Sequence, residues 1–226
     1  MPQMNETELR GIVESVVRKM LGGAPPASAP ERPKASSYSP RPRGVYETVD
    51  AAVQAAREAF RVLNSMTLEQ RAKIISAIRA CGIKNAREFA ERTIKETGMG
   101  RLQDKLNKMF SSAERTPGIE DIATAAWSGD SGLTTEEMAP WGVIAAVTPS
   151  THPVPTLINN AISMVAAGNA VVFAPHPASK NVFLYAIGLI NDAITEAGGP
   201  ENILVTTAEP TIESAAELFK HPGAPL

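Results

Sequence analysis

The fold is decided by residues 141–177, WGVIAAVTPSTHPVPTLINNAISMVAAGNAVVFAPHP. The stretch opens with a continuous apolar run at 143–147, which is too short for an ordinary helix and contains the β-branched residues typical of a strand buried on both faces. Thr148 and Pro149 end this run, because proline cannot donate a hydrogen bond to a sheet. A buried strand followed by a polar turn is therefore predicted here.

A helix is predicted next, at 156–167, because its apolar residues recur at spacings of three and four. Pro153 and Pro155 precede it and predict irregular backbone between the strand and the helix. A second apolar strand at 170–174 follows at once. Strand, helix and strand form a βαβ unit, whose strands lie parallel and whose crossover is right-handed in almost all proteins.

Both strands of this unit end in proline-rich turns. Ligands of open parallel sheets bind at the carboxyl ends of the strands, so we expect the two turns to lie at the same rim. The sequence contains no GxGxxG motif, and on spacing alone the turns could simply end the strands. The side chains suited to contacting a ligand are Thr148, Ser150, Thr151, His152 and His176.

Composition excludes several classes of protein. The 226 residues are 43% hydrophobic and 20% charged, with a formal net charge of −2, so no basic surface for nucleic acid is expected. The only cysteine, Cys81, rules out an intramolecular disulfide framework and a cysteine-rich zinc site, and no metal site is predicted. The sequence shows neither an apolar run long enough to span a bilayer nor a secretory signal, so no membrane association is expected.

The rest of the chain divides by pattern into an amphipathic helix within 1–21, a Pro/Ala/Ser-rich linker at 22–44, a helical part at 45–121 and a hairpin-like connection at 122–140. The first helix either packs on its own domain or docks on a separate protein. Cys81 is expected at the end of a helix, as a small core residue instead of a nucleophile. Further elements are predicted as helices at 49–63, 68–80, 83–97, 102–112, 180–197 and 212–219, and a third buried strand at 202–206.

Several segments together resemble the N-terminal half of the CoA-acylating aldehyde dehydrogenases of bacterial microcompartments, of the ethanolamine- and propanediol-utilisation type. They are ETGMGRLQDK, PWGVIAAVTPSTHP, INNAISMVAAGNAVVFAPHPASK and GGPENILVT. The resemblance runs from about residue 45 to the end, and residues 1–21 with the linker resemble the encapsulation peptide of that group. It implies an aldehyde-dehydrogenase-like α/β fold, in which a helical segment precedes a Rossmann-like parallel β-α-β domain. We expect residues 141–226 to form an incomplete NAD-binding sheet.

The resemblance also implies an activity and partners. In such enzymes NAD binds the sheet, a cysteine thiolate attacks the aldehyde, hydride passes to NAD, and coenzyme A takes the acyl group. The turn formed by Thr148, Pro149, Ser150 and Thr151 corresponds to the nicotinamide side. The turn formed by Pro175, His176 and Pro177 corresponds to the segment that meets the adenosine ribose. A homo-oligomer is expected of the complete enzyme, in the lumen of a cytoplasmic microcompartment, with residues 5–21 docked on a shell protein.

Two departures from the family pattern stand out. His152 occupies the place where relatives have asparagine, so the contact with the thioester oxyanion is assigned to either Thr151 or His152. The nucleophilic cysteine of the family lies beyond residue 226, and Cys81 matches no catalytic motif, so we expect this chain alone to be inactive. The alternative is a non-catalytic cargo or interaction remnant that docks on a shell protein through its N-terminal helix.

Overall fold

The computed structural model describes residues 42–224. The helix predicted within 1–21 and nearly all of the predicted linker, 22–44, lie outside these described residues. Within residues 42–224, no helix combines the length and the apolarity that crossing a membrane requires.

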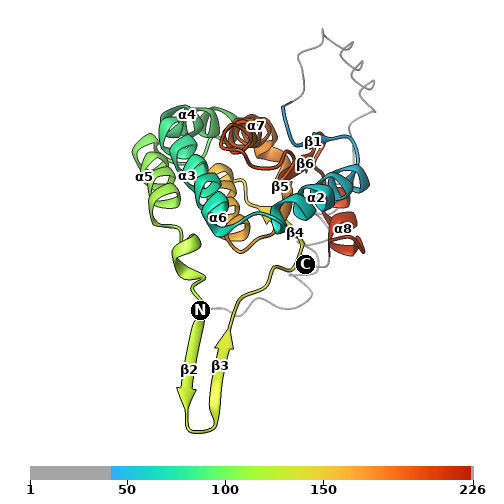
Figure 1. Ribbon diagram of the computed structural model, residues 1–226. Helices are drawn as coiled ribbons and strands as arrows, with labels where there is room; N and C mark the ends of the chain where they lie inside the picture. The colour runs from blue at the N-terminus through green and yellow to red at the C-terminus, as the bar shows by residue number, and fades with distance from the viewer. Residues whose placement is uncertain (1–41, 225–226) are drawn as a thin grey trace, which may run out of the picture. The chain divides into compact units, whose positions relative to one another are not determined.

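A four-stranded parallel sheet lies at the centre of the fold, in the order β1-β6-β5-β4 (Figure 1). The two middle strands are buried along their whole length, which explains their uninterrupted apolar sequences. The strand β4 forms one edge, where Val147 is 52% exposed. The strands are β1 (Val45–Tyr46), β4 (Val143–Thr148), β5 (Ala170–Pro175) and β6 (Leu204–Thr207).

Helices cover both faces of the sheet (Figure 1). The helices α2 (Val49–Asn64) and α8 (Ile212–Lys220) lie on one face, and α6 (Pro153–Ala166) and α7 (Lys180–Glu196) lie on the other. A further layer packs on α6 and α7 and consists of α3 (Leu68–Lys84), α4 (Ala86–Thr97) and α5 (Leu102–Arg115). The expected α/β architecture, with a helical segment before a parallel sheet, is confirmed.

The helix α6 begins earlier than the sequence predicts. Pro153 and Pro155 were expected to keep the backbone irregular, but both lie in the first turn of α6, which starts at Pro153. This prediction was wrong because the first turn of a helix needs no intrahelical N–H donor, and the φ of proline already suits a helix. As a result, His152 becomes the residue that immediately precedes the helix.

Three other local predictions need correction. The helix α3 does not end near Cys81 but continues through Gly82 to Lys84, since a single glycine is tolerated within a helix. The spacing of Leu102, Leu106, Met109 and Phe110 predicts that all four lie on the buried face of α5, but Phe110 is 37% exposed. Val45–Tyr46, expected in helical sequence, forms β1, because pairing with β6 stabilises a strand too short to carry a periodic pattern.

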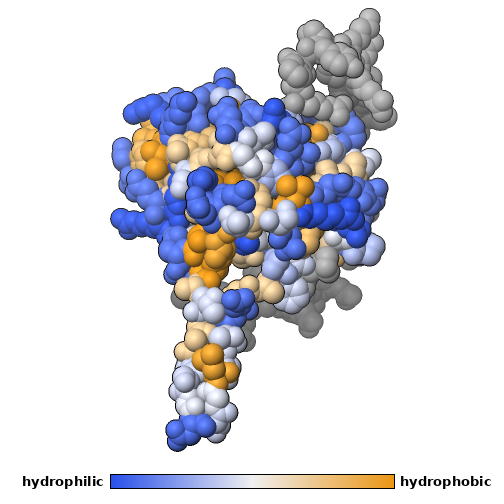
Figure 2. Space-filling view, in the orientation of Figure 1, coloured by the Kyte–Doolittle hydropathy of each residue, from blue (hydrophilic) through white to orange (hydrophobic). Residues whose placement is uncertain are grey.

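The hairpin expected between 122 and 140 is present. The strands β2 (Ala125–Gly129) and β3 (Gly132–Glu136) pair antiparallel, and the hairpin extends away from the sheet and helices (Figure 1). It carries exposed apolar side chains, Trp127 at 55% and Leu133 at 69%, and hydrophobic patches interrupt its surface in Figure 2.

Candidate functional site

The two proline-rich turns lie side by side. Thr148 and Pro175 are register partners at the ends of β4 and β5, and the backbone N–H of His176 donates to the carbonyl of Thr148 at 3.1 Å. The prediction that both turns share one rim is therefore confirmed. The same rim extends to the end of β6, where Glu209 forms an ion pair with Lys180 at 2.8 Å.

Thr148 has a polar atom without a partner at this rim. Its side chain is fully buried, and among residues 42–224 its Oγ1 has no hydrogen-bond partner. Buried hydroxyl groups are normally paired, so such an atom suggests a missing donor or acceptor. Pro149 and Ser150, which follow, are half-buried, and Thr151 is exposed.

His176 presents a defined hydrogen-bond donor to solvent. The ring is exposed, and its Nδ1 accepts from the backbone N–H of Ala178 at 3.1 Å, so it caps the short 3-10 helix η2 (Pro177–Ser179). A neutral imidazole that accepts at Nδ1 carries its proton at Nε2. The second turn thus offers an Nε2–H donor at the rim.

Thr151 and His152 form a coupled pair in the first turn. Thr151 Oγ1 lies 2.7 Å from His152 Nδ1. The carbonyl of His152 accepts from Thr156 at the start of α6, from N at 3.2 Å and from Oγ1 at 2.9 Å. Burial, followed by the positive charges of Lys108 and Lys105, lowers the pKa of His152 below its ordinary value, so the ring is neutral at pH 7.

Lys105 also belongs to the site, although sequence pattern did not predict it: its Nζ donates to the carbonyl of Thr151. Only 4% of this lysine is exposed, and burial, then Lys108, lowers the pKa of its ammonium group. A signal was available: Lys105 occupies a position on the apolar face of α5 that also carries Leu106 and Met109.

Two hollows flank this contact between α5 and the first turn. One has a volume of about 310 Å³ and lies beside His152, and the other has a volume of about 270 Å³ and lies beside Thr151. The first is lined by Lys108, Ser111, Ser112, His152, Pro155, Thr156 and Asn159, and the second by Met99, Gly100, Asp104, Lys105, Lys108 and Thr151.

Glu96, also missed, occupies the N-terminus of α7 beside the second turn. Its carboxylate accepts from the backbone N–H groups of Asn181 at 2.8 Å and Val182 at 2.7 Å. These are the groups that would otherwise attract an anionic ligand to a helix start. The N-terminus of α7 is therefore already satisfied by the protein.

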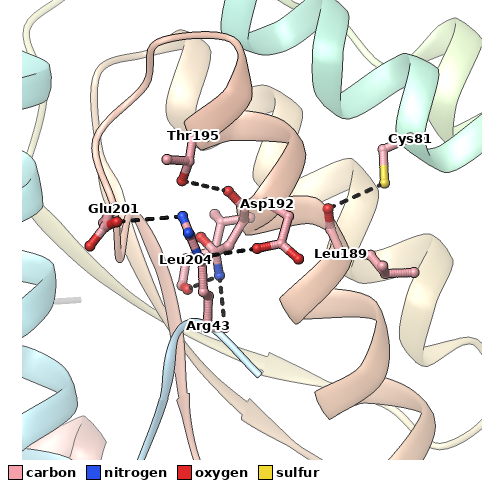
Figure 3. A network of polar contacts seen from close by, with 8 residues as sticks. Arg43, Cys81, Leu189, Asp192, Thr195, Glu201 and Leu204 are labelled. Atoms are coloured by element: carbon pink, nitrogen blue, oxygen red, sulfur yellow. Dashed lines mark hydrogen bonds and ion pairs between the residues drawn. The ribbon is translucent and has the colours of Figure 1, made fainter. Parts of the chain in front are cut away.

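Cys81 lies outside this site, on α3 where it faces α7 (Figure 3). Its thiol donates to the carbonyl of Leu189 at 3.6 Å, and burial raises its pKa, which opposes formation of a nucleophilic thiolate. Neither hollow beside the rim includes it. The expectation that Cys81 is a core residue agrees with this geometry.

A polar network next to Cys81 fixes the start of the described chain (Figure 3). Arg43 forms ion pairs with Asp192 of α7 at 3.2 Å and with Glu201 at 3.4 Å.

Within residues 42–224, no three His, Cys, Asp or Glu side chains are grouped so that they could hold a metal ion.

The sequence matches the family described as the Aldehyde dehydrogenase family over residues 35–226. Together with the parallel sheet and its rim, this match shows that the chain belongs to the aldehyde dehydrogenase family.

Known relatives define the branch of the family more closely. The chain is 49% identical over 223 residues to the acetaldehyde dehydrogenase (acetylating) EutE of Salmonella typhimurium, covering 99% of this chain and 45% of that protein. It therefore spans less than half the length of this relative. The resemblance to CoA-acylating enzymes found in the sequence is confirmed.

Two solved structures share the fold. The propionaldehyde dehydrogenase of the Clostridium phytofermentans fucose utilisation bacterial microcompartment matches with a TM-score of 0.79 and 48% identity, over 81% of this chain and 42% of that one. The Rhodopseudomonas palustris propionaldehyde dehydrogenase, solved with bound CoA and an acylated cysteine, matches with a TM-score of 0.78 and 43% identity, over 80% and 42%.

Proposed function

We propose that this chain forms part of an NAD-dependent CoA-acylating aldehyde dehydrogenase, which converts an aldehyde, coenzyme A and NAD to acyl-CoA and NADH. The observation that carries the proposal is the common rim, where the N–H of His176 contacts the carbonyl of Thr148 at 3.1 Å in a chain 49% identical to an acetylating acetaldehyde dehydrogenase. Two adjacent turns at the carboxyl ends of parallel strands are the usual ligand position in such sheets.

We assign the residues at the rim to binding of a dinucleotide. The exposed Nε2–H of His176 suits a ribose hydroxyl, with Pro175 and Pro177 shaping its turn. The turn from Thr148 through Pro149 and Ser150 to Thr151 is assigned to the nicotinamide side, and it begins at the buried Thr148 Oγ1, which has no hydrogen-bond partner among residues 42–224. When bound, NAD supplies the hydride acceptor and coenzyme A the acyl acceptor.

The pair Thr151 and His152 is proposed to bind the oxyanion of the substrate. If the Thr151 hydroxyl donates to His152 Nδ1, the ring keeps its Nε2–H; if Nδ1–H donates to Thr151 Oγ1, the hydroxyl proton is available instead. Either tautomer of the neutral ring leaves one donor for an oxyanion. Cys81, the only cysteine among residues 42–224, lines neither hollow beside this rim, so we do not assign it as the nucleophile.

Replacement of His176 tests this assignment. In the full-length enzyme that contains this sequence, His176→Asn keeps an acceptor for the N–H of Ala178 but removes the Nε2–H donor. We expect NAD to bind about fivefold more weakly by calorimetry, which corresponds to the loss of about 1 kcal/mol for one hydrogen bond.

His221 provides a matched control for this test. Its Nδ1 accepts from the backbone N–H of Gly223 at 3.0 Å, the same type of local cap, but it follows α8 and contacts Asp50 instead of the rim. His221→Asn is expected to leave NAD affinity unchanged. Equal NAD affinity in wild type and His176→Asn would remove His176 from the site.

Localisation and assembly belong to the same proposal. We place the enzyme in the lumen of a bacterial microcompartment, with residues 5–21 bound to a shell protein, and we propose that the complete enzyme is a homo-oligomer. Support comes from the resemblance of residues 1–21 to an encapsulation peptide and from the similarity to the Clostridium phytofermentans microcompartment enzyme. The alternative is a non-catalytic chain that docks on a shell protein. It would be targeted in the same way but would form no NADH.

A further inference from the structure

Lys105 is a charged side chain in an unusual place. It lies within the packed face of α5 with only 4% of its surface exposed, and lysine is rarely buried to this extent without a partner. The nearest acid along α5, Asp104, bonds Arg101 at 2.7 Å. The contact that the structure gives Lys105 is the carbonyl of Thr151, so the buried ammonium group is directed at the backbone of the rim turn.

This contact acts on both residues of the candidate oxyanion pair. A peptide group is planar, so holding the carbonyl oxygen of Thr151 also sets the direction of the N–H of His152. The two side chains that branch from this peptide unit are joined by the 2.7 Å contact between Thr151 Oγ1 and His152 Nδ1. A single donor from α5 thus controls the orientation of a peptide and of the hydroxyl–imidazole pair attached to it.

Gly100 lies next to the side chain of Lys105. A Cβ atom at Gly100 would lie 2.8 Å from Lys105 Cε, so the end of the lysine side chain would have to move, and the φ of +86° at Gly100 is one that other residues rarely adopt. The segment Gly98–Gly100 and the turn at 148–152 are far apart in sequence, and Lys105 connects them. Two of the segments that carry the family resemblance therefore meet through one buried lysine.

We propose that Lys105 is a positioning residue for catalysis, because its bond to the Thr151 carbonyl orients Thr151 and His152 toward the substrate carbonyl. This inference rests on the proposed function, since it assigns the pair to the oxyanion. Lys105 does not touch the substrate; it acts through the turn. If Lys105 had a purely structural role, its replacement would lower stability but would change neither the mobility of the turn nor the rate of the reaction step.

The first test uses nuclear magnetic resonance of this 226-residue chain. In Lys105→Met, we expect the backbone amides of 150–152 to exchange at least about fivefold faster with solvent, since one hydrogen bond to the turn is lost. Lys108→Met is the matched control: Lys108 lies one turn further along α5 and its charge also lowers the pKa of His152. Both variants raise the titration midpoint of His152, but only Lys105→Met loosens the turn.

A measurement on the wild-type chain covers the case in which Lys105→Met fails to fold. The ammonium protons of Lys105 should be protected from solvent, and its Nζ should show a scalar coupling through the hydrogen bond to the carbonyl carbon of Thr151. Absence of this signal overturns the proposal, as does a turn that exchanges equally fast in Lys105→Met and Lys108→Met. Lys105→Arg, which keeps a cationic donor, is expected to restore part of the protection.

The second test measures kinetics in the full-length enzyme that contains this sequence. Lys105→Met should lower kcat about tenfold or more and leave the KM for NAD within about twofold, because an interaction needed in the transition state is disturbed. An unchanged kcat, with the wild type active, overturns the positioning role. If the wild type forms no NADH from aldehyde and coenzyme A while Lys105→Met loosens the turn, the contact between Lys105 and the turn is upheld and the proposed function fails.

Discussion

Glu96 provides a quantitative test of how the second turn is supported. Its two carboxylate oxygens accept from the N–H groups of Asn181 and Val182 at 2.8 and 2.7 Å, where α7 begins just after the turn that carries His176. Hydrogen bonds to a charged group contribute about 1.5–3 kcal/mol each. Asn181 is exposed, so water replaces part of its bond, and we expect Glu96→Ala to lower the free energy of unfolding by about 3 kcal/mol.

The assay is urea unfolding followed by circular dichroism. With a slope of about 1–3 kcal/mol per molar urea, the midpoint of Glu96→Ala should fall by about 1 M or more. Glu96→Gln keeps one oxygen acceptor but loses the charge and one bond, so its loss should be about half as large. In addition, the freed N–H groups at the start of α7 should let sulfate stabilise Glu96→Ala more than the wild type.

Glu91 is the matched control on the same helix. It is exposed and pairs with Arg87 at 3.3 Å, an arrangement that contributes about 0.3–0.5 kcal/mol. If Glu96→Ala shifts the urea midpoint no more than Glu91→Ala does, the carboxylate does not support α7, and the reasoning fails.

Two further predictions concern His152 and residues 1–21. The pKa of His152 should lie below the ordinary value of about 6.5, because burial and two lysines disfavour its charged form. The contribution of the neutral ring to stability is therefore complete above about pH 6.5. It is lost as the pH falls through the lowered pKa. A midpoint at or above 6.5, followed by histidine ring resonances, would contradict this. Residues 1–22 fused to a fluorescent reporter should give puncta in cells that make shells, whereas diffuse fluorescence would count against encapsulation.

Local pattern predicted most elements well. A threonine at 67 with a glutamine three residues later predicts a capping box at the start of α3. The structure has it: Gln70 N donates to Thr67 Oγ1 at 3.2 Å, and Thr67 N donates to Gln70 Oε1 at 2.8 Å. The hairpin turn and the three long strands also agree with the sequence, because hydrophobic period and turn residues act within a few positions of the chain. The start of α6 was predicted too late, because proline occurs both in irregular backbone and in the first turn of a helix, and the local sequence does not distinguish the two.

The sequence by itself determined the βαβ unit, the two proline-rich turns and their common rim. Alternation of apolar strand, helix and strand leaves few topologies, and parallel strands bring their carboxyl ends to one side. Only the tertiary structure decided which residues support the rim. Lys105 and Thr151 are 46 positions apart, and Glu96 and Asn181 are 85 apart. Such pairs depend on how α4 and α5 pack against α6 and α7. Hydrophobic periodicity predicts which face of a helix is buried, but it does not predict which polar group of another element that face contacts.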